Sequence, residues 1–209
     1  MRIGRTVRTS LGRFEAPVSA FYRKLFIDLD ACVRVLAERV PAMSILEVGC
    51  GDGQLAGPLL DRFPDATYHG IDIAPEVGRL FEGDRARAHF GSVDSRTFLA
   101  GTDQRFDLVL LVDVLHHVPR LARADVLADV RALTRSGGCY VVKDWLRSHS
   151  LVHAGVWVSD RILTGDRVAY FAPDELQSLV PELFPEDSEL FTTAVPPHHN
   201  NVLLAYRRS

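Results

Sequence analysis

The sequence predicts a doubly wound α/β fold, in which parallel strands alternate with helices on both faces of one sheet. Short apolar runs alternate with segments of helical periodicity from residue 45 to residue 142. A glycine-rich turn follows the first apolar run, at EVGCGDG. The run FDLVLLV at 106–112 is strongly apolar, which is typical of a central parallel strand covered on both faces. Together these patterns indicate a parallel sheet with crossover helices.

The first expected unit is a strand, a helix and a second strand. Residues 45–48 (ILEV) form a short apolar run that predicts a buried strand. A helix is expected over 54–63, and Pro64-Asp65 separates it from a second strand at 67–71. This order is that of a βαβ unit.

The alternation continues through the middle of the chain. A short helical piece is expected at 76–81, followed by a third strand at 88–91. After the fourth strand, residues 121–134 carry apolar side chains at helical spacing. A glycine pair is expected to close that helix before a fifth strand at 139–142.

Two segments fall outside the alternation. Ahead of the first strand, residues 17–40 carry apolar side chains at helical intervals, which predicts a helical cover beside the sheet or over its ligand edge. After the fifth strand, 148–163 is predicted helical and another helix begins at Pro173. Strands at 190–195 and 201–206 flank the turn PPHHN, so the chain is expected to end in a hairpin and the sheet in an antiparallel strand.

Composition excludes several classes of function. The net charge is −3, and the 24 Lys and Arg residues are scattered among 27 acids, so no nucleic-acid footprint stands out. No apolar run reaches the length of a membrane span, and the arginine-rich N-terminus lacks the apolar segment of a secretory signal. We expect a cytoplasmic protein, either a monomer or a homodimer.

The three cysteines predict neither a disulfide framework nor a zinc site. Cys32, Cys50 and Cys139 include no CxxC pair and no Cys/His pair at zinc spacing. We expect all three to be reduced.

The glycine loop alone leaves two ligands open. Gly51, Gly53 and Ala56 fit the dinucleotide pattern G-x-G-x-x-A, and Asp72 follows nearly twenty residues later. Glu47 and Asp52 beside the loop would, however, repel a pyrophosphate. The ammonium and sulfonium of S-adenosylmethionine (SAM) suit these acids better.

From about Ile45 to its C-terminus the chain resembles the class I SAM-dependent methyltransferases, in particular the small-molecule methyltransferase domains of types 11 and 12. EVGCGDG matches their first motif, GIDI with Asp72 the second, SVD with Asp94 the adenine segment, and FDLVLLVDVLHHV the fourth-strand motif. The resemblance implies a Rossmann-like sheet of seven strands whose last strand is antiparallel. It also implies SAM as cofactor, S-adenosylhomocysteine as product, and a setting such as natural-product biosynthesis.

The resemblance assigns the cofactor-binding residues by position. Backbone of the glycine loop would pass under the methionine part, Glu47 would support the loop, and Asp72 would accept from both ribose hydroxyls. Side chains beside the adenine and an acid after the fourth strand, near the methionine amino group or the methyl acceptor, complete the set. The assigned residues are Glu47, Gly49, Gly51, Gly53, Asp72, Ile73, Val93, Asp94 and Asp113.

Methyl transfer from a sulfonium needs an acceptor held in line and, for a hydroxyl or ammonium, a route for its proton. Asp144 follows the fifth strand, where open α/β sheets gather ligands, and Trp145 could wall the acceptor pocket. His117, of the pair His116-His117, and His153 are the further candidates. A local hydrogen bond would explain the pair His116-His117 without catalysis, and a solvated helix face would explain His153.

Two other chemistries are disfavoured. A metal-dependent mechanism would use acids after the fourth and fifth strands, and Asp113 and Asp144 are so placed, but Trp145 stands where such enzymes carry Asn. We therefore expect no metal. The N/D-P-P-Y/F motif of DNA amino methylation is absent after the fourth strand, so DNA is not the expected substrate.

The sequence thus predicts one methyltransferase domain over 1–209 acting on a small, partly apolar or ring-bearing acceptor, with oxygen favoured over carbon or nitrogen as the methylated atom. Two alternatives stay open: a SAM-binding protein that does not methylate, such as a cyclase or cofactor sensor, and an NAD-dependent oxidoreductase. The expected parts are a mobile arm (1–14), the helical cover (15–41), the SAM-binding core (42–147), an acceptor-pocket insert or lid (148–172), and the last helix with the terminal hairpin (173–209).

Overall fold

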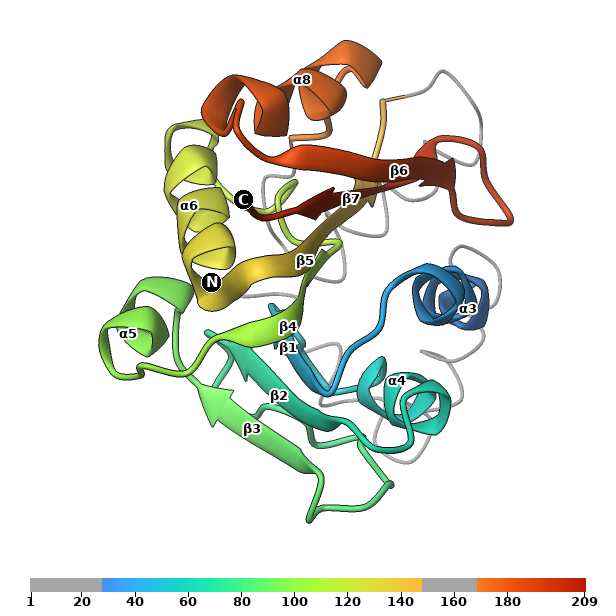
Figure 1. The fold of residues 1–209 in the computed structure, drawn as a ribbon, viewed down its shortest axis with the longest axis vertical. Coiled ribbons are helices and arrows are strands. Elements are labelled where there is room, and N and C mark those ends of the chain that lie inside the picture. Colours follow the sequence, from blue (N-terminus) through green and yellow to red (C-terminus); the bar gives the residue numbers. More distant parts are fainter. Residues whose placement is uncertain (1–27, 148–168) are drawn as a thin grey trace, which may run out of the picture.

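The computed structural model describes residues 28–147 and 169–209, which form a seven-stranded sheet with helices on both faces (Figure 1). The strand order is β3-β2-β1-β4-β5-β7-β6. The predictions for the N-terminal arm, for most of the insert and for His153 lie outside the described residues. The strands are β1 Ser44–Val48, β2 Thr67–Asp72, β3 Ala88–Ser92, β4 Phe106–Val112, β5 Thr134–Trp145, β6 Ser188–Ala194 and β7 Asn201–Arg207.

The sheet confirms the predicted doubly wound topology. Strand β1 pairs in parallel with β2 on one side and with β4 on the other, so the strand order reverses between them. Such a reversal is the place where open α/β sheets bind ligands, outside the carboxyl ends of the strands. Strand β7 pairs antiparallel with both β5 and β6, which confirms the expected hairpin and antiparallel last strand.

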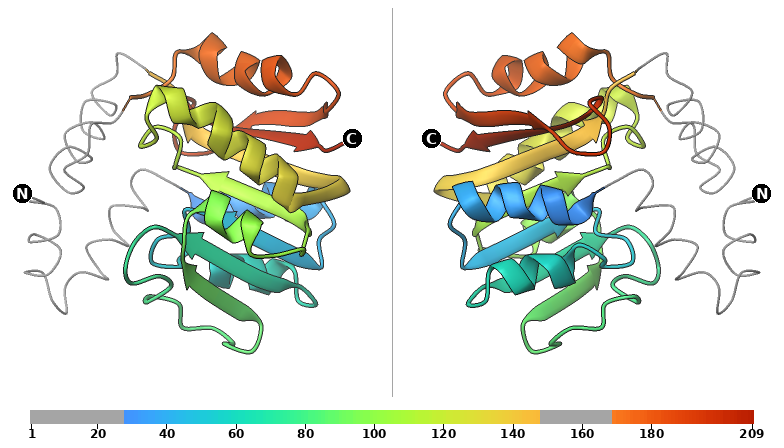
Figure 2. Two further views of the ribbon diagram at one scale, coloured as in Figure 1. Left: turned by 90° about the vertical axis from the view of Figure 1, so that its left-hand side faces the viewer. Right: turned by 90° about the vertical axis from the view of Figure 1, so that its right-hand side faces the viewer.

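Helices form one layer on each face of the sheet (Figures 1 and 2). Helices α3 (Leu29–Arg39) and α4 (Ala56–Arg62) pack on one face. Helices α5 (Ser95–Ala100), α6 (Arg123–Leu133) and α8 (Pro173–Leu183) pack on the other, and a 3₁₀ turn (Arg120–Ala122) precedes α6.

Alternation along the central strands fills both layers. In β1 the side chain of Ile45 joins the cluster under α3 and α4, whereas Leu46 and Val48 join the cluster under α6. Strand β4 is buried from Leu108 to Val112 and contributes to both clusters. The interpretation of FDLVLLV as a central strand is therefore confirmed.

The prediction of a short helix at 76–81 was wrong, because this segment forms turns whose backbone is hydrogen-bonded to the glycine loop. Gly78 has φ +67°, and its N–H donates to the carbonyl of Gly51 at 3.0 Å. The N–H of Leu80 donates to the carbonyl of Asp52, also at 3.0 Å. These donors bond across to another loop, so they are not available to a local helical ladder.

One boundary and one further helix also differ from expectation. The glycine pair does not close a helix: α6 ends at Leu133 and β5 begins at Thr134, so Gly137 and Gly138 lie inside a longer strand. Helix α5 was not foreseen, because its six residues are too few for a recognisable period. Its N-cap is Asp94, whose side chain accepts from the backbone of Thr97.

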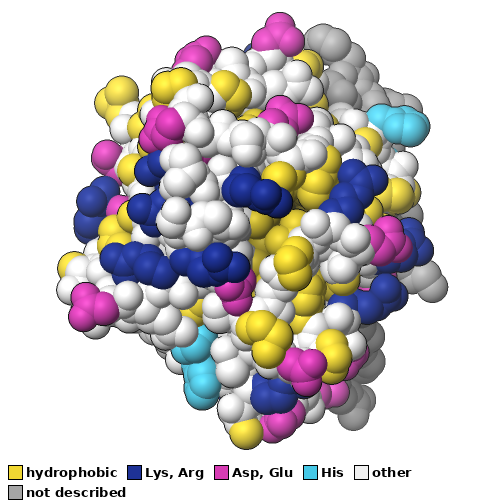
Figure 3. All heavy atoms as spheres, viewed as in Figure 1, with side chains coloured by type: hydrophobic (Ala, Val, Ile, Leu, Met, Phe, Trp, Pro, Cys, Tyr) yellow, Lys and Arg dark blue, Asp and Glu magenta, His cyan; other side chains and the backbone are white. Residues whose placement is uncertain are grey.

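The remaining surface and core features agree with the composition. The three cysteines are free and buried. Basic and acidic side chains intermingle on the face shown in Figure 3. Within 28–147 and 169–209, no helix is both long enough and apolar enough to cross a membrane.

One buried carboxylate ties the C-terminal part of the chain to the sheet. Asp187 accepts from Arg131 Nε at 2.6 Å and Nη2 at 2.9 Å, from Tyr140 Oη at 2.8 Å and from the backbone N–H of Ser209 at 3.0 Å. Burial by itself would raise the pKa of Asp187, but the Arg131 guanidinium and the other donors outweigh it and lower the pKa from 3.8 to about 2.

We expect Asp187→Asn to lower the free energy of unfolding by about 2 kcal/mol at pH 7, because a charged acceptor with four donors is lost. The native pKa lies below the unfolded one, so this stabilisation is present above about pH 4 and disappears as the pH falls toward about 2. Urea titrations across this range measure it. The control is Glu186→Gln, which removes a half-exposed partner of the same arginine and should cost less than about 0.5 kcal/mol. Equal losses in the two variants would contradict the assignment.

Candidate active site

The glycine loop between β1 and α4 has positive φ at Gly49, Gly51 and Gly53, and at the first and last of these a side chain would also collide with neighbouring atoms. Gly49 has φ +80°, and a Cβ there would lie 2.3 Å from Cγ2 of Val114. Gly53 has φ +79°, and its Cβ would lie 2.8 Å from the Cα of Gly78. Around Gly51, in contrast, a Cβ would meet nothing within 4 Å. The loop is therefore packed tightly against the protein at both ends and is open at its centre.

The carboxylate of Asp72 lies at the end of β2 and faces this loop. Its Oδ2 accepts from the N–H of Gly51 at 2.9 Å, and its Oδ1 accepts from the N–H of Ala74 at 2.8 Å. Each oxygen retains a lone pair for a further donor. The next side chain, Ile73, is 83% exposed. A fixed carboxylate beside an exposed aliphatic side chain suits a ribose with its attached base.

Glu47 lies beneath the loop and not on its surface. Its side chain is buried and accepts a short hydrogen bond from the hydroxyl of Tyr68 on β2. Burial raises the pKa of Glu47 from 4.5 to about 7, although the Tyr68 hydrogen bond opposes this. The carboxyl group therefore titrates near neutrality. Tyr68, the partner of Glu47, lies 21 residues away along the chain and could not be predicted from the motif around Glu47.

Val93 and Asp94 follow β3 at the same edge of the sheet. Val93 is partly buried, and its N–H donates to the carbonyl of Asp72 at 2.9 Å. The carboxylate of Asp94 caps α5, accepting from the N–H of Thr97 at 2.8 Å and from its hydroxyl at 2.9 Å. These hydrogen bonds lower the pKa of Asp94. An exposed, ionised acceptor thus stands at the same edge of the sheet as Asp72.

Asp113, just after β4, forms an ion pair that the sequence did not disclose. It is the single non-glycine residue with positive φ in the described parts of the chain, at 57°. The ammonium of Lys143 lies 2.7 Å from Oδ1 and 2.6 Å from Oδ2. Lys143 is fully buried, and such a lysine requires a partner. The available signal was a lysine inside the apolar run YVVKDW.

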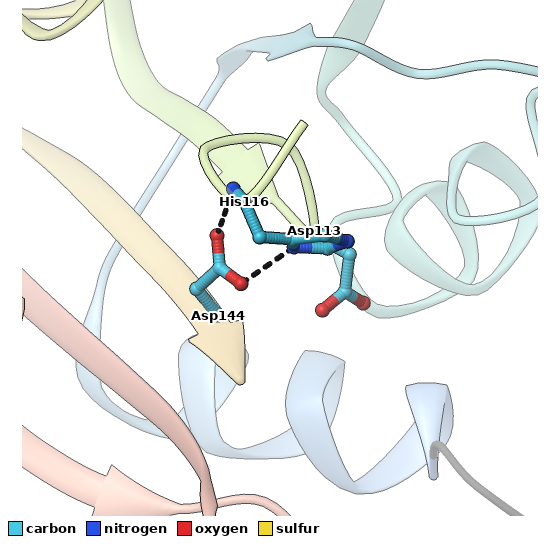
Figure 4. A group of neighbouring side chains, drawn as sticks. All are labelled: Asp113, His116 and Asp144. Carbon is cyan, nitrogen blue, oxygen red and sulfur yellow. Dashed lines mark hydrogen bonds and ion pairs between the residues drawn. The ribbon is translucent and has the colours of Figure 1, made fainter. Parts of the chain in front are cut away.

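Asp144 and His116 form a second buried pair at the ends of β5 and β4 (Figure 4). Asp144 is fully buried and accepts from the backbone N–H of His116 at 3.1 Å and from its ring Nδ1 at 2.6 Å. It also accepts from the N–H of Trp145 at 2.7 Å. Because a carboxylate can only accept, Nδ1 carries the proton and the Nε2 of a neutral ring is the basic nitrogen.

The rings around this pair hold His116 in place. Its ring stacks on Tyr170 with centroids 5.4 Å apart and planes at 23°, and the ring of His117 lies 4.1 Å away. His116 is buried, whereas His117 is partly exposed. The structure therefore brings Asp144 together with His116, while His117, the histidine chosen from the sequence, is its neighbour.

Asp113, His116 and Asp144 could also be viewed as a metal site, since one ligand atom from each lies within 4.8 Å of the others. Lys143 argues against this interpretation. Its ammonium already binds both oxygens of Asp113, and a divalent cation there would have to displace it or sit beside a positive charge. The arrangement favours two separate pairs, one ionic and one hydrogen-bonded.

The sequence of this chain is similar to those of known methyltransferases. A family model described as "Methyltransferase domain" matches residues 46–140. A malonyl-[acyl-carrier protein] O-methyltransferase of Geobacter sulfurreducens is 30% identical over 207 residues, which cover 92% of this chain and 77% of that protein. A protein of the same name from Acetivibrio thermocellus is 41% identical over 87 residues, which cover 40% of this chain and 27% of that protein.

Solved structures share the fold. The S-adenosylmethionine-dependent methyltransferase SibL superposes with a TM-score of 0.73 at 19% identity, covering 96% of this chain and 60% of that one. This chain therefore spans about a quarter of the Acetivibrio protein and three fifths of SibL.

We expect Glu47→Gln to change the dependence of stability on pH. The native pKa of about 7 lies above the unfolded value of 4.5, so the native state binds the extra proton and wild-type stability falls as pH rises from about 4.5 to about 7. The glutamine side chain of the variant stays neutral at every pH. The free energy of unfolding of the variant, minus that of wild type, should therefore increase by about 2 to 3 kcal/mol from pH 4.5 to pH 8.

Denaturant titrations at both pH values test this prediction. The control is Glu182→Gln, at an exposed carboxylate of α8. A constant difference between Glu47→Gln and wild type across this range would show that the pKa of Glu47 is the same in the native and unfolded protein.

Proposed function

The chain belongs to the class I SAM-dependent methyltransferases, and on that basis we propose that it transfers the methyl group of SAM to a small-molecule acceptor. The observation that carries the proposal is the hydrogen bond of 2.9 Å from the N–H of Gly51 to Oδ2 of Asp72. It fixes a carboxylate beside the open centre of the glycine loop. In this family the cofactor supplies an activated methyl group. The protein has to bind the cofactor, orient the acceptor and remove a proton where the acceptor requires it.

The site fits SAM through groups that are already in place. Asp72 offers one free lone pair on each oxygen to the two ribose hydroxyls, and Ile73 and Val93 would flank the adenine, with Asp94 accepting from its amino group. Asp113 would lie near the methionine part of the cofactor, where it would share its two oxygens between the ammonium of Lys143 and the ammonium of SAM. Glu47 supports the loop from below. The same acids would repel the negatively charged pyrophosphate of NAD.

We propose His116 as the group that accepts the acceptor's proton, with Asp144 as the residue that positions it. Asp144 is fully buried and holds three N–H donors, so it supports the imidazole and does not itself meet the acceptor. A neutral imidazole with Nδ1–H fixed carries its lone pair on Nε2. This arrangement favours oxygen as the methylated atom, because a hydroxyl must lose its proton. The named O-methyltransferases among the relatives support the same choice.

The activity is tested by incubating the protein with SAM that carries a deuterated methyl group and with a metabolite extract. Mass spectrometry should find a mass-shifted product together with S-adenosylhomocysteine. SAM binding with no labelled product would instead support a use of the cofactor without methyl transfer, and failure to bind SAM would contradict the proposed function.

We expect Asp72→Ala to weaken SAM binding by well over tenfold in titration calorimetry, because charged hydrogen bonds to the ribose are lost in a partly buried site. The control is Asp61→Ala, on the exposed side of α4, which should bind SAM like the wild type. Unchanged affinity in Asp72→Ala would mean that the ribose is held elsewhere.

We expect His116→Gln to lower the rate of labelled-product formation by about 100-fold to 10,000-fold, because the proton acceptor is removed. Asp144→Asn should lower the rate by a smaller factor, because the imidazole remains but is no longer held as the Nδ1–H tautomer. Both variants should bind SAM within about threefold of wild type. His89→Gln, on exposed β3, is the control. Loss of SAM binding in either site variant would contradict this assignment and would show that His116 and Asp144 belong to the cofactor site.

A further inference from the structure

Two histidines face each other on neighbouring strands at one side of the sheet. His69 of β2 pairs with His89 of β3 in the parallel register, so their side chains project from the same face. The centres of the two imidazole rings are 4.8 Å apart, with the ring planes at 42°. Each histidine lies three residues before the end of its strand, about 10 Å from the carboxyl edge of the sheet. The pair therefore lies outside the candidate active site.

The pair is accessible from solvent. Strand β3 is the last strand on its side of the sheet, and the side chain of His89 is exposed, whereas that of His69 is half-buried. Histidine side chains reach the surface over β3 in Figure 3. The ring of His69 also contacts the buried ring of Phe106, with centres 5.2 Å apart. One imidazole is thus held by packing, and the other is free to turn toward a ligand that arrives from solvent.

The ring of His69 is in the state that binds metal ions. Burial lowers the pKa of His69, and the neighbouring His89 ring lowers this pKa further. The imidazole is therefore neutral at pH 7, and one of its nitrogens carries a free lone pair. Its Nδ1 is buried and has no hydrogen-bond partner within 28–147 and 169–209. Such a nitrogen is unfavourable in the folded protein unless a ligand completes it.

The separation of the rings fits a shared ion. A zinc–imidazole bond of about 2.0 to 2.1 Å places the ion about 3.2 Å from the ring centre, so two rings on one tetrahedral ion have centres about 5 Å apart. The observed 4.8 Å is close to this value. The cluster of Asp113, His116 and Asp144 differs in chemistry, because the ammonium of Lys143 occupies its carboxylate.

We propose that His69 and His89 bind a divalent transition-metal ion of the class that prefers imidazole, such as Zn²⁺, Ni²⁺ or Cu²⁺, through one nitrogen of each ring. Water completes the coordination. The ion holds the edge strand β3 to β2. It takes no part in methyl transfer, so the proposal does not depend on the proposed function.

The test is a calorimetric titration of the full chain, free of SAM, with ZnSO₄. His69→Gln and His89→Gln should each weaken this site at least about tenfold, because the second imidazole no longer binds intramolecularly. The double variant should bind no more weakly than either single variant, since one lost ligand already breaks the chelate. His199→Gln, at an exposed histidine of the terminal turn, is the control and should bind like the wild type. MgSO₄ should give no binding at the pair, because Mg²⁺ prefers oxygen. Unchanged zinc affinity in both single variants, or losses that simply add in the double variant, would overturn the proposal.

NMR of protein labelled with ¹⁵N-histidine identifies the ligands directly. The ring signals that are absent from the spectra of His69→Gln and His89→Gln should shift together as zinc is added to the wild type. Zinc shifts confined to other histidines would overturn the proposal.

Thermal unfolding gives a further readout that does not depend on His69→Gln being stable. Zinc should raise the melting temperature of wild type and of His199→Gln, because the ion binds the folded pair, and should raise that of His89→Gln by much less. An equal rise in His89→Gln and wild type would overturn the proposal. These measurements use neither SAM nor an acceptor, so their failure is distinct from a failure to transfer methyl groups.

Discussion

The parallel pairing of β1 with both β2 and β4 is the constraint on which the site depends. Parallel strands end at a common edge, and the register that sets Val48 opposite Ile71 and Leu111 brings the residues that follow each strand together. The N–H groups of the glycine loop then face the end of β2, where two of them donate to the carbonyl of Ile71 and one to Asp72. The geometry of the loop is thus a consequence of strand pairing as much as of its glycines.

The acids gathered at this edge are each stabilised in a different way. Burial favours the protonated form of Glu47, backbone N–H groups hold Asp72, an ammonium neutralises Asp113, and an imidazole and backbone donors hold Asp144. Without such partners, several carboxylates close together would repel one another and destabilise the fold. With them, the edge can receive a cofactor that carries both a sulfonium and an ammonium.

Sequence reasoning worked where the pattern is local and failed where contacts are made across the sheet. The strand β4 and the strand β2 that ends at Asp72 were predicted correctly, since each depends on a few adjacent residues. The prediction of a helix over 76–81 failed because amide groups of this segment bond to the distant glycine loop. No local periodicity in the sequence reveals such contacts. The partner of Asp113 is 30 residues away, on the neighbouring strand β5.

By itself the sequence determined the doubly wound fold, the family, the glycine loop and the acids that surround it, because strand periodicity and motif spacing are recorded in consecutive residues. Tertiary structure decided which side chains work together. It set His116, and not His117, against Asp144, buried Lys143 on Asp113, and placed His69 beside His89 on neighbouring strands. These relations depend on the order and register of the strands, which are fixed only when the two apolar layers pack on the finished sheet.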